Sequence, residues 1–180
     1  REGKGTTWEG GVRVPSIIKF PNGLKPRIVS EPVMGIDWMP TFASITDSKL
    51  SKNKIDGKNI WPLLSGKTNK SPHKKLYFYY RVNELHSIRM DEWKIHFKRT
   101  YRSLNGKNGG KDGMPVKYDM NLLEKNELYN LKNDPEERNN VYDDFPEIVL
   151  MMEKLGIKAR EELGDNLTDV IGKENREARK

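Results

Sequence analysis

The sequence predicts an α/β fold in two parts: the end of a large mixed sheet with a helix, then a small antiparallel sheet with a C-terminal helix. A continuous apolar run at 12–20 is typical of a strand that is buried on both faces. Apolar and polar side chains alternate through 76–99, as in strands with one covered face. After Pro146 the apolar residues recur at helical spacing.

The first expected element is a strand over 12–20 (VRVPSIIKF), which is rich in β-branched residues and ends at the turn signal Pro21-Asn22-Gly23. The polar, breaker-rich stretch 66–75 (GKTNKSPHKK) follows later and marks a domain boundary. We therefore expect three parts, which are a first domain over 1–70, a second over 71–165 and a charged tail over 166–180.

A helix is expected to begin at Asp37, which is a good N-cap residue. Pro40 then falls in the first turn, where proline is tolerated. Met39, Phe42 and Ala43 share one face of this helix, so we expect them to pack in the core.

The second domain is expected to hold an antiparallel meander with strands at 76–82, 85–90 and 93–99 and a last short strand near 127–131. The alternation predicts one apolar face on the core and one polar face in solvent. Between these strands, 100–120 is full of Gly, Lys and Asn, which predicts a long mobile loop.

The final helix is expected to begin near Pro146, a residue favoured in the first turn, and to end at Gly164. Gly156 weakens it by about 1 kcal/mol relative to alanine, so packing must hold it. The tail 166–180 is expected to be an extended or frayed arm. The apolar stripe consists of Ile148, Met152, Leu155, Ala159 and Leu163.

Composition narrows the classes of function. The formal charge of +7 arises from 33 basic and 26 acidic residues, and a moderate basic excess favours anionic partners. The lysines are scattered and no zinc-ligand or RNA-binding signature is present, so nucleic acid is not an expected partner. The absence of cysteine excludes disulfides and thiolate metal sites, and no apolar run is long enough for a membrane span. The start at Arg1, within a motif, suggests a fragment of a longer protein.

The richest motif surrounds Lys4, which lies between Gly3 and Gly5. Glycine lets the backbone approach a ligand closely, and lysine provides a compact, mobile positive charge. Such a charge can neutralise an oxygen of a sulfate or a phosphate. We expect Gly10-Gly11 to take positive φ and reverse the chain. From the residues alone, a solvated loop lysine is the alternative.

The order of residues here resembles a segment that type I sulfatases, of the alkaline-phosphatase-like superfamily, carry in the second half of their catalytic domain. In that family the lysine binds the sulfate of the substrate, so the resemblance assigns that catalytic and substrate-binding role to Lys4. It also implies a secreted or periplasmic location and a sulfated small molecule or glycan as substrate. The segment reads Gly3-Lys4-Gly5-Thr6-Thr7-Trp8-Glu9-Gly10-Gly11-Val12-Arg13-Val14-Pro15.

The resemblance continues in patches to about Gly164, with a helix of the form Asp-x-x-Pro-Thr, a following loop, a hairpin and a late strand and turn. It implies that 1–70 is the end of the catalytic domain and 71–165 the small C-terminal subdomain. These patches are 37–41, 55–66, 88–94 and 127–137.

Sulfatases also need a formylglycine, made from a Cys or Ser in a motif ending in Arg, and a divalent metal, usually calcium, held by Asp and Asn oxygens. The nearest serine match begins at Ser30 but has Met34 where arginine is required, so we reject it. We expect the nucleophile and the metal ligands in an N-terminal part outside these residues, which is the implied partner. The chain alone should be inactive.

The remaining polar candidates have structural alternatives. His73 lies in a connection of the kind that shapes the leaving-group pocket of sulfatases, so a substrate contact is expected there. His86 and His96 lie in strand-like runs, where satisfied or solvated histidines are ordinary. For Glu9 and Arg13 we expect structural roles, with Glu9 accepting from the glycine turn and Arg13 donating to carboxylates or carbonyls.

Three readings of function remain open. The first is a sulfatase, and the second is a phosphate or phosphonate ester hydrolase of the same superfamily, because Lys4 suits either anion. The third is a non-catalytic basic module that binds a glycan. The loop 100–120, with Arg102, Lys107 and Lys111, would meet such a glycan or be a solvated basic loop.

Overall fold

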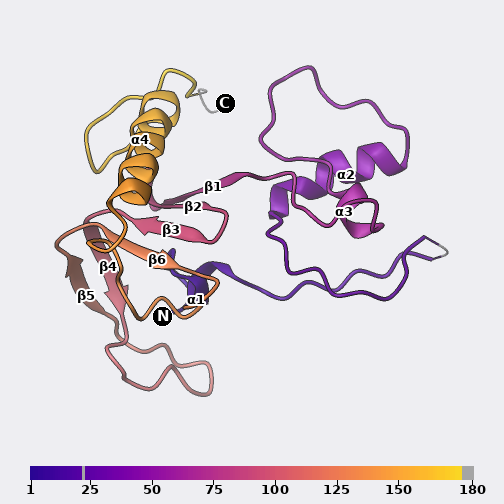
Figure 1. Cartoon of the computed structure of the whole chain (residues 1–180). Helices are drawn as coiled ribbons and strands as arrows, with labels where there is room; N and C mark the ends of the chain where they lie inside the picture. The colour runs from indigo at the N-terminus through magenta and orange to yellow at the C-terminus, as the bar shows by residue number, and fades with distance from the viewer. Residues whose placement is uncertain (22, 176–180) are drawn as a thin grey trace. The chain divides into compact units, whose positions relative to one another are not determined.

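The structure, a computed structural model, describes residues 1–21 and 23–175 (Figure 1). Within these residues the helical elements are α1 (Glu9–Val12), the 3-10 helix η1 (Gly35–Asp37), α2 (Trp38–Ile45), α3 (Trp61–Leu64) and α4 (Pro146–Leu163). The strands are β1 (Lys75–Tyr80), β2 (Glu84–Met90), β3 (Trp93–His96), β4 (Arg99–Ser103), β5 (Asp119–Leu123) and β6 (Glu127–Asn130). In the described part of the chain, no helix is both long and apolar enough to cross a membrane.

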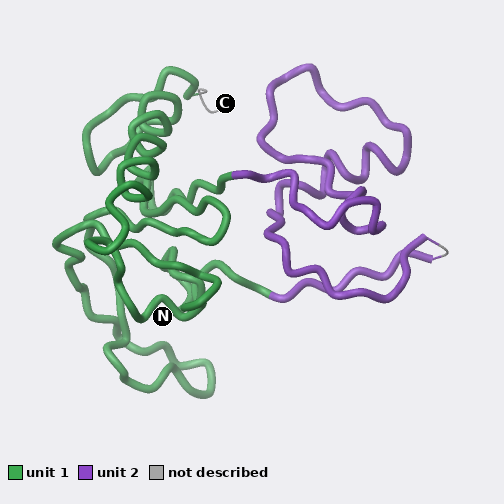
Figure 2. Tube along the Cα trace, viewed as in Figure 1, with its two compact units in different colours: residues 1–14, 75–180 green, residues 15–74 purple. Residues whose placement is uncertain are grey.

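The chain forms two compact units, which Figure 2 colours separately. The larger unit contains residues 1–14 and 75–180, and the smaller unit contains residues 15–74. The Lys4 segment therefore belongs with the C-terminal sheet. The division at 1–70, 71–165 and 166–180 concerns the domains of the whole protein and stays a prediction.

The larger unit is built on a four-stranded antiparallel sheet with the order β1-β2-β3-β6. Its register places Ile88 opposite Ile95 and Ile95 opposite Leu128, so these three side chains lie on one face. The expected strands at 76–82, 85–90 and 127–131 are confirmed with small shifts at their ends. The expected run at 93–99 instead divides between β3 and the start of β4.

Helix α4 packs on this apolar face (Figure 1). The helix begins at Pro146 and Gly164 caps its end at φ +81°, as expected. A Cβ on Gly156 would lie 2.7 Å from the Phe97 ring, so glycine here permits close packing of the helix on the sheet. The core cluster comprises Leu85, Ile88, Ile95, Phe97, Leu128, Val149, Met152 and Ala159.

The opposite face of the sheet is polar, but it is not in solvent, and the expectation of a solvated face is wrong. Lys94 and His96 are both fully buried. The segment 1–14 supplies the cover, because Trp8 stacks on His96 and Glu9 pairs with Lys94. Alternation predicts which side chains share a face, but it does not predict what covers that face.

A second sheet, formed by β4 and β5, occupies part of the stretch expected as one long loop over 100–120. The connecting loop runs only over 104–118. Tyr101 and Leu123 form a small buried cluster with Trp8. This burial stabilises β4 and β5, although their polar sequence does not predict strands.

The tail is also more ordered than expected in its described part. Buried Asp165 accepts from the backbone N–H of Leu85 at 3.1 Å and pairs with Arg160 at 2.8 Å. The backbone of Lys173 donates to Glu161 at 3.0 Å, so the chain after Gly164 returns to the helix end instead of extending away. Residues 176–180 of the expected arm lie outside the described residues.

In the smaller unit, the expected strand over 12–20 is not formed. Residues 13–20 pair with no strand among the described residues, and the side chain of Ile17 is 97% exposed. A strand needs a neighbour for its backbone groups, and an apolar sequence does not supply one. The expected turn at Pro21-Asn22-Gly23 includes Asn22, which lies outside the described residues.

Helix α2 is confirmed after Asp37, but its buried face differs from the prediction. Met39 and Phe42 are each 56% exposed, whereas Pro40 and Thr41 are buried. The Thr41 hydroxyl donates to the Asp37 carbonyl at 2.6 Å and accepts from the backbone of Ile60 at 3.0 Å. Polar contacts, more than an apolar stripe, therefore orient this short helix.

Candidate functional site

Lys4 lies in an exposed turn with a free side chain. Gly5 adopts φ +92°, which favours glycine, and the Thr6 hydroxyl closes the turn by donating to the Gly3 carbonyl at 2.9 Å. No hydrogen bond or ion pair joins Lys4 to any residue that the structure describes. The ammonium group is therefore available to an external anion.

Lys4 lines a pocket of about 480 Å³ on the larger unit, which we call the Lys4 pocket. Three cationic side chains, from Arg1, Lys4 and Arg102, line it against one carboxylate, that of Glu2, which accepts from the Ser103 hydroxyl at 2.9 Å. An excess of fixed positive charge favours an anionic ligand. Besides Lys4, the wall includes Arg1, Glu2, Tyr101, Arg102 and Asn105.

Trp8 anchors the segment that carries Lys4. Its ring is fully buried and stacks on His96 with centroids 4.6 Å apart and planes inclined by 16°. The Arg99 guanidinium lies 4.5 Å from the same ring, and Tyr101 packs at 4.5 Å. Stacking and cation–π contacts of this kind stabilise a desolvated aromatic ring by about 1–2 kcal/mol.

A buried ion cluster, formed by Glu9, Lys94 and Glu137, holds the segment a second time. Lys94 Nζ lies 2.7 Å from Glu9 Oε1 and 3.2 Å from Glu137 Oε1. The backbone N–H of Glu9 donates to Glu137 Oε2 at 2.5 Å. Buried charges need close partners, so this geometry ties the start of α1 to β3.

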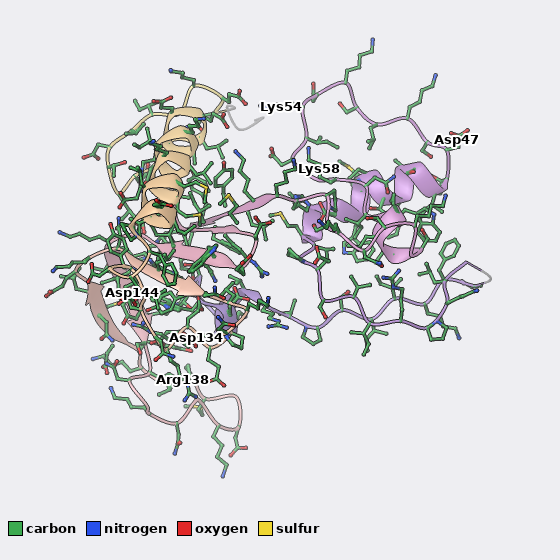
Figure 3. The ribbon with its side chains drawn as sticks, in the orientation of Figure 1. Asp47, Lys54, Lys58, Asp134, Arg138 and Asp144 are labelled. Atoms are coloured by element: carbon green, nitrogen blue, oxygen red, sulfur yellow. The ribbon has the colours of Figure 1, made fainter. Side chains whose placement is uncertain are left out.

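Glu137 reaches the cluster from the turn after β6, in the region of Asp134 and Arg138 that Figure 3 labels. Asp134 Oδ2 accepts from the backbone N–H groups of Arg138 and Asn139, each at 2.8 Å. These bonds fix the turn in which Glu137 adopts φ +55°. The turn thus directs the Glu137 carboxylate toward Lys94 on the polar face of the sheet.

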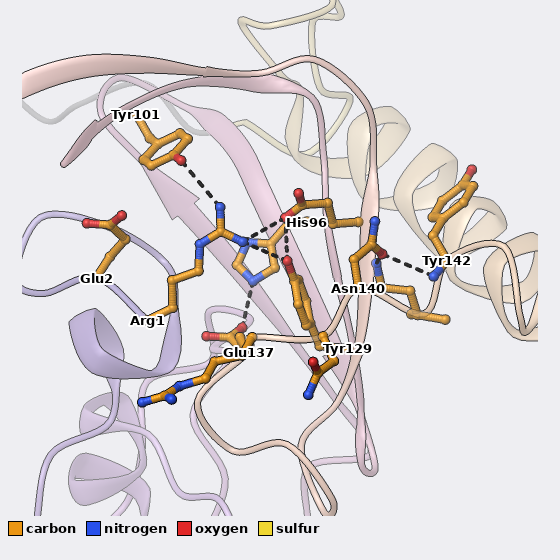
Figure 4. Close-up of polar contacts among 12 residues, drawn as sticks. Arg1, Glu2, His96, Tyr101, Tyr129, Glu137, Asn140 and Tyr142 are labelled. Carbon is orange, nitrogen blue, oxygen red and sulfur yellow. Dashed lines mark hydrogen bonds and ion pairs between the residues drawn. The ribbon is translucent and has the colours of Figure 1, made fainter. Parts of the chain in front are cut away.

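His96 is a neutral member of this site. Burial, followed by Lys94 and Arg99, holds its pKa well below the usual value. Because Arg99 Nη2 donates to Nδ1 at 3.0 Å, the proton of the neutral ring lies on Nε2, which donates to Glu137 at 2.7 Å (Figure 4). Both ring nitrogens are satisfied, in keeping with the structural interpretation.

His86 is likewise held inside the protein. Its Nε2 lies 2.8 Å from Glu84, and burial lowers its pKa to about 4. This contact gives His86 a structural partner. Both ring nitrogens of His96 are occupied, whereas His86 also lines a pocket on the larger unit.

Arg1 extends beside this cluster (Figure 4). Its guanidinium donates to the hydroxyls of Tyr129 at 2.8 Å and Tyr101 at 3.3 Å, and it pairs with Glu127 at 3.1 Å. Burial raises the pKa of Tyr129, whose hydroxyl donates to Glu127. The Tyr129 phenol therefore remains a protonated hydrogen-bonding group.

The backbone of Gly10-Gly11 and the contacts of Arg13 differ from those predicted. Gly10 and Gly11 lie within α1 without positive φ, and a Cβ would come 2.0 Å from the Glu2 carbonyl oxygen and 2.4 Å from that of Thr6. Close packing therefore requires glycine there. Arg13 is exposed and has no partner in the part of the chain that the structure describes. Glu9 has a structural role, but it accepts from Lys94 and not from the glycine turn.

His73 lies in the smaller unit, whereas Lys4 lies in the larger one. Its Nε2 is 2.8 and 2.9 Å from the two oxygens of fully buried Asp37. Asp37 also accepts from the backbone N–H groups of Met34 and Lys58, each at 2.8 Å. This arrangement gives His73 a structural partner, and its contact with a substrate stays a prediction.

Three further residues of this site were not predicted from the sequence, namely Lys94, Arg99 and Glu137. The available signal in the sequence was the charged residues at alternate positions of a short strand, but this pattern is also typical of a strand face in solvent. Among the described residues, no group of three or more His, Asp or Glu side chains is arranged to hold a metal ion.

Comparisons with known proteins give the family. A model of the C-terminal region of aryl-sulfatase matches residues 71–176, and one of the C-terminal part of N-sulphoglucosamine sulphohydrolase matches residues 3–105. Arylsulfatase A of Bos taurus is 32% identical over 152 residues, which cover 82% of this chain and 30% of that protein. The chain thus spans less than a third of that relative's length.

Solved structures of sulfatases are also similar to this chain. The PsFucS1 sulfatase from Pseudoalteromonas sp. is 25% identical with a TM-score of 0.67, over 89% of this chain and 32% of that chain. Ps i-CgsB, solved in complex with k-i-k-neocarrahexaose, is 25% identical with a TM-score of 0.51, over 72% and 24% of the two chains. The fold class is confirmed as mixed α/β with antiparallel sheets and a C-terminal helix. The chain belongs to the sulfatase family and matches the C-terminal region of its members.

Proposed function

We propose that the whole protein hydrolyses sulfate esters and that Lys4 binds the sulfate group of the substrate. The observation that carries this proposal is a lysine without a protein partner, exposed in a pocket, on a segment that buried contacts hold in place. The match of this segment to a family model of a sulphohydrolase supports it.

Electrostatics explain what Lys4 contributes. An ammonium group held against a sulfate oxygen stabilises the negative charge that shifts during cleavage of the ester. It does so best when its position is fixed beforehand, since no reorganisation is then needed. Trp8, Glu9 and Glu137 supply that fixation through the backbone and are positioning residues.

The substrate class in this proposal is a sulfated small molecule or glycan. One structural relative holds a neocarrahexaose, which supports carbohydrate as the scaffold. The Lys4 pocket also combines Tyr101 with Arg1 and Arg102, a mixture of aromatic and cationic groups that suits a charged sugar.

The family resemblance also implies calcium and formylglycine. The described residues do not fit either group, because they form no metal-binding cluster, the sequence has no cysteine, and the nearest serine match at Ser30 has Met34 where arginine is required. We therefore propose that other residues of the whole protein provide both and that this chain by itself is inactive. A secreted or periplasmic location is part of the same proposal.

The proposal is tested by assaying the intact protein with matched aryl esters of sulfate and phosphate. We expect turnover of the sulfate ester at a kcat/KM well above that of the phosphate ester. Preference for the phosphate ester would assign the protein to phosphoryl chemistry, and turnover of neither would support a binding module.

A further inference from the structure

A second pocket, of about 320 Å³, lies on the larger unit beside the Lys4 pocket. The two pockets share Thr6, Tyr101, Arg102 and Tyr118. We call the second one the Arg99 pocket. The wall residues that matter here are Trp8, Tyr80, Arg81, Arg99, Arg102 and Tyr118.

Arg99 is a buried cation without a paired carboxylate. Arg99 is only 3% exposed, and no described carboxylate forms an ion pair with its guanidinium. Nη1 donates to the carbonyls of His86 at 3.0 Å and Phe97 at 2.8 Å, while Nη2 donates to Thr7 at 3.2 Å and to His96. All four acceptors are neutral, and burial lowers the pKa of Arg99 to about 10. A desolvated charge in such surroundings gains from a nearby anion.

Two buried N–H groups on the wall have no acceptor. Arg99 Nε and Trp8 Nε1 both lack a hydrogen-bond partner among the described residues. Folded proteins leave few buried donors unpaired, because each costs about 1–3 kcal/mol. Both atoms are themselves buried, so they add unbalanced donor charge behind the wall of the pocket and are not direct contacts for a ligand.

Two further guanidinium groups line the pocket. Arg102 donates to the Tyr80 hydroxyl at 2.6 Å and to the Gly5 carbonyl at 3.4 Å, and its guanidinium lies 5.5 Å from the Tyr118 ring. Arg81 lies 3.8 Å from Glu84, which is already engaged by His86. Glu84 is outside the wall, so three guanidiniums face a pocket without a carboxylate of its own.

We propose that the Arg99 pocket binds a carboxylate or sulfate group that is separate from the group bound by Lys4. Planar guanidiniums match the oxygens of either anion in bidentate geometry. The proposal does not depend on hydrolysis, since binding is measured directly. A ligand with two anionic groups would span both pockets across Arg102.

The indole N–H signal of Trp8 in the NMR spectrum of the intact protein reports on this pocket, and Trp8→Phe identifies that signal by its loss. The probes are inorganic sulfate and glucuronate, titrated into the wild type and into Lys4→Ala. We expect a saturable shift of the signal in both proteins. A shift with only one of the two probes shows whether the pocket binds sulfate or carboxylate. A shift with either probe, or with both, supports the proposal.

Arg102→Gln tests the cause of the shift. We expect it to weaken binding about tenfold, whereas the exposed control Arg138→Gln should not change it. Arg99→Met should abolish the shift, and Arg102→Gln keeps the test decisive if that variant does not fold. Absence of a saturable shift, its loss in Lys4→Ala, or an unchanged affinity in Arg102→Gln would overturn the proposal.

Discussion

Lys94 Nζ lies 2.7 Å from Glu9 Oε1, and this buried pair joins the segment that carries Lys4 to the central strand of the C-terminal sheet. Glu137 Oε1 is a second carboxylate partner of the same ammonium, at 3.2 Å. The C-terminal sheet of this chain is therefore part of the structure that holds the Lys4 turn.

Removing the Lys94 charge should destabilise the protein strongly. Lys94→Met leaves two carboxylates buried without their cation, which costs about 3–5 kcal/mol. The matched control is Lys107→Met, because Lys107 pairs with Asp119 at 2.6 Å but both side chains are exposed, and its loss should change the stability much less. Chemical denaturation of the intact protein measures both, and equal losses would disprove the buried cluster.

Stability should fall as the pH falls below about 6.5, the usual histidine pKa. Burial lowers the pKa of His96 and takes that of His86 to about 4, so the unfolded chain binds protons that the folded one does not. Each such histidine makes the free energy of unfolding decrease by up to about 1.4 kcal/mol per pH unit between its two pKa values. His86→Gln should reduce the slope between pH 6 and 5 by roughly one histidine's share. An unchanged slope would contradict the pKa assigned to His86.

The turn beside Lys4 should tolerate alanine at one glycine and not at the other. A Cβ on Gly5 would lie 2.5 Å from the Arg102 guanidinium at φ +92°, while a Cβ on Gly3 meets no atom within 4 Å. We expect Gly5→Ala to destabilise the protein by about 1–3 kcal/mol and Gly3→Ala by less than about 1 kcal/mol. Thermal unfolding compares the two variants, and equal effects would contradict the turn geometry.

His73 should matter more for stability than for substrate binding. His73→Ala leaves the buried carboxylate of Asp37 short of a donor, which costs about 1–3 kcal/mol. His73→Gln keeps a donor and should restore much of this stability. Steady-state kinetics gives the opposing outcome: a raised KM in a stable His73→Gln protein would support the substrate contact expected from the sequence.

The parts of the fold that local patterns encode were predictable. Helix α4 begins at Pro146 and ends before Gly164 because helical spacing and caps act over neighbouring residues. The run at 12–20 failed as a strand because pairing depends on a partner that its own sequence does not specify. Strands β4 and β5 were hidden for a related reason, since burial of Tyr101 against Trp8 links residues far apart in the chain.

The candidate site divides in the same way. The Lys4 turn could be singled out because it lies in a contiguous motif, and the role assigned to Lys4 stays a prediction. The support of this turn was not predictable, since Glu9 meets Glu137 across 128 positions and neither residue marks the other in the sequence. Charged residues on a strand face give the same pattern whether water or a second segment covers them.

The role of Lys4 is tested most directly by kcat/KM of the intact protein toward an aryl sulfate, measured for Lys4→Ala beside Lys111→Ala, an exposed lysine of the 104–118 loop. We expect Lys4→Ala to lose about 100-fold or more with an unchanged unfolding midpoint, because it removes a fixed charge from the reacting sulfate. Lys111→Ala should match the wild type. Wild-type kcat/KM in a folded Lys4→Ala protein would contradict the account.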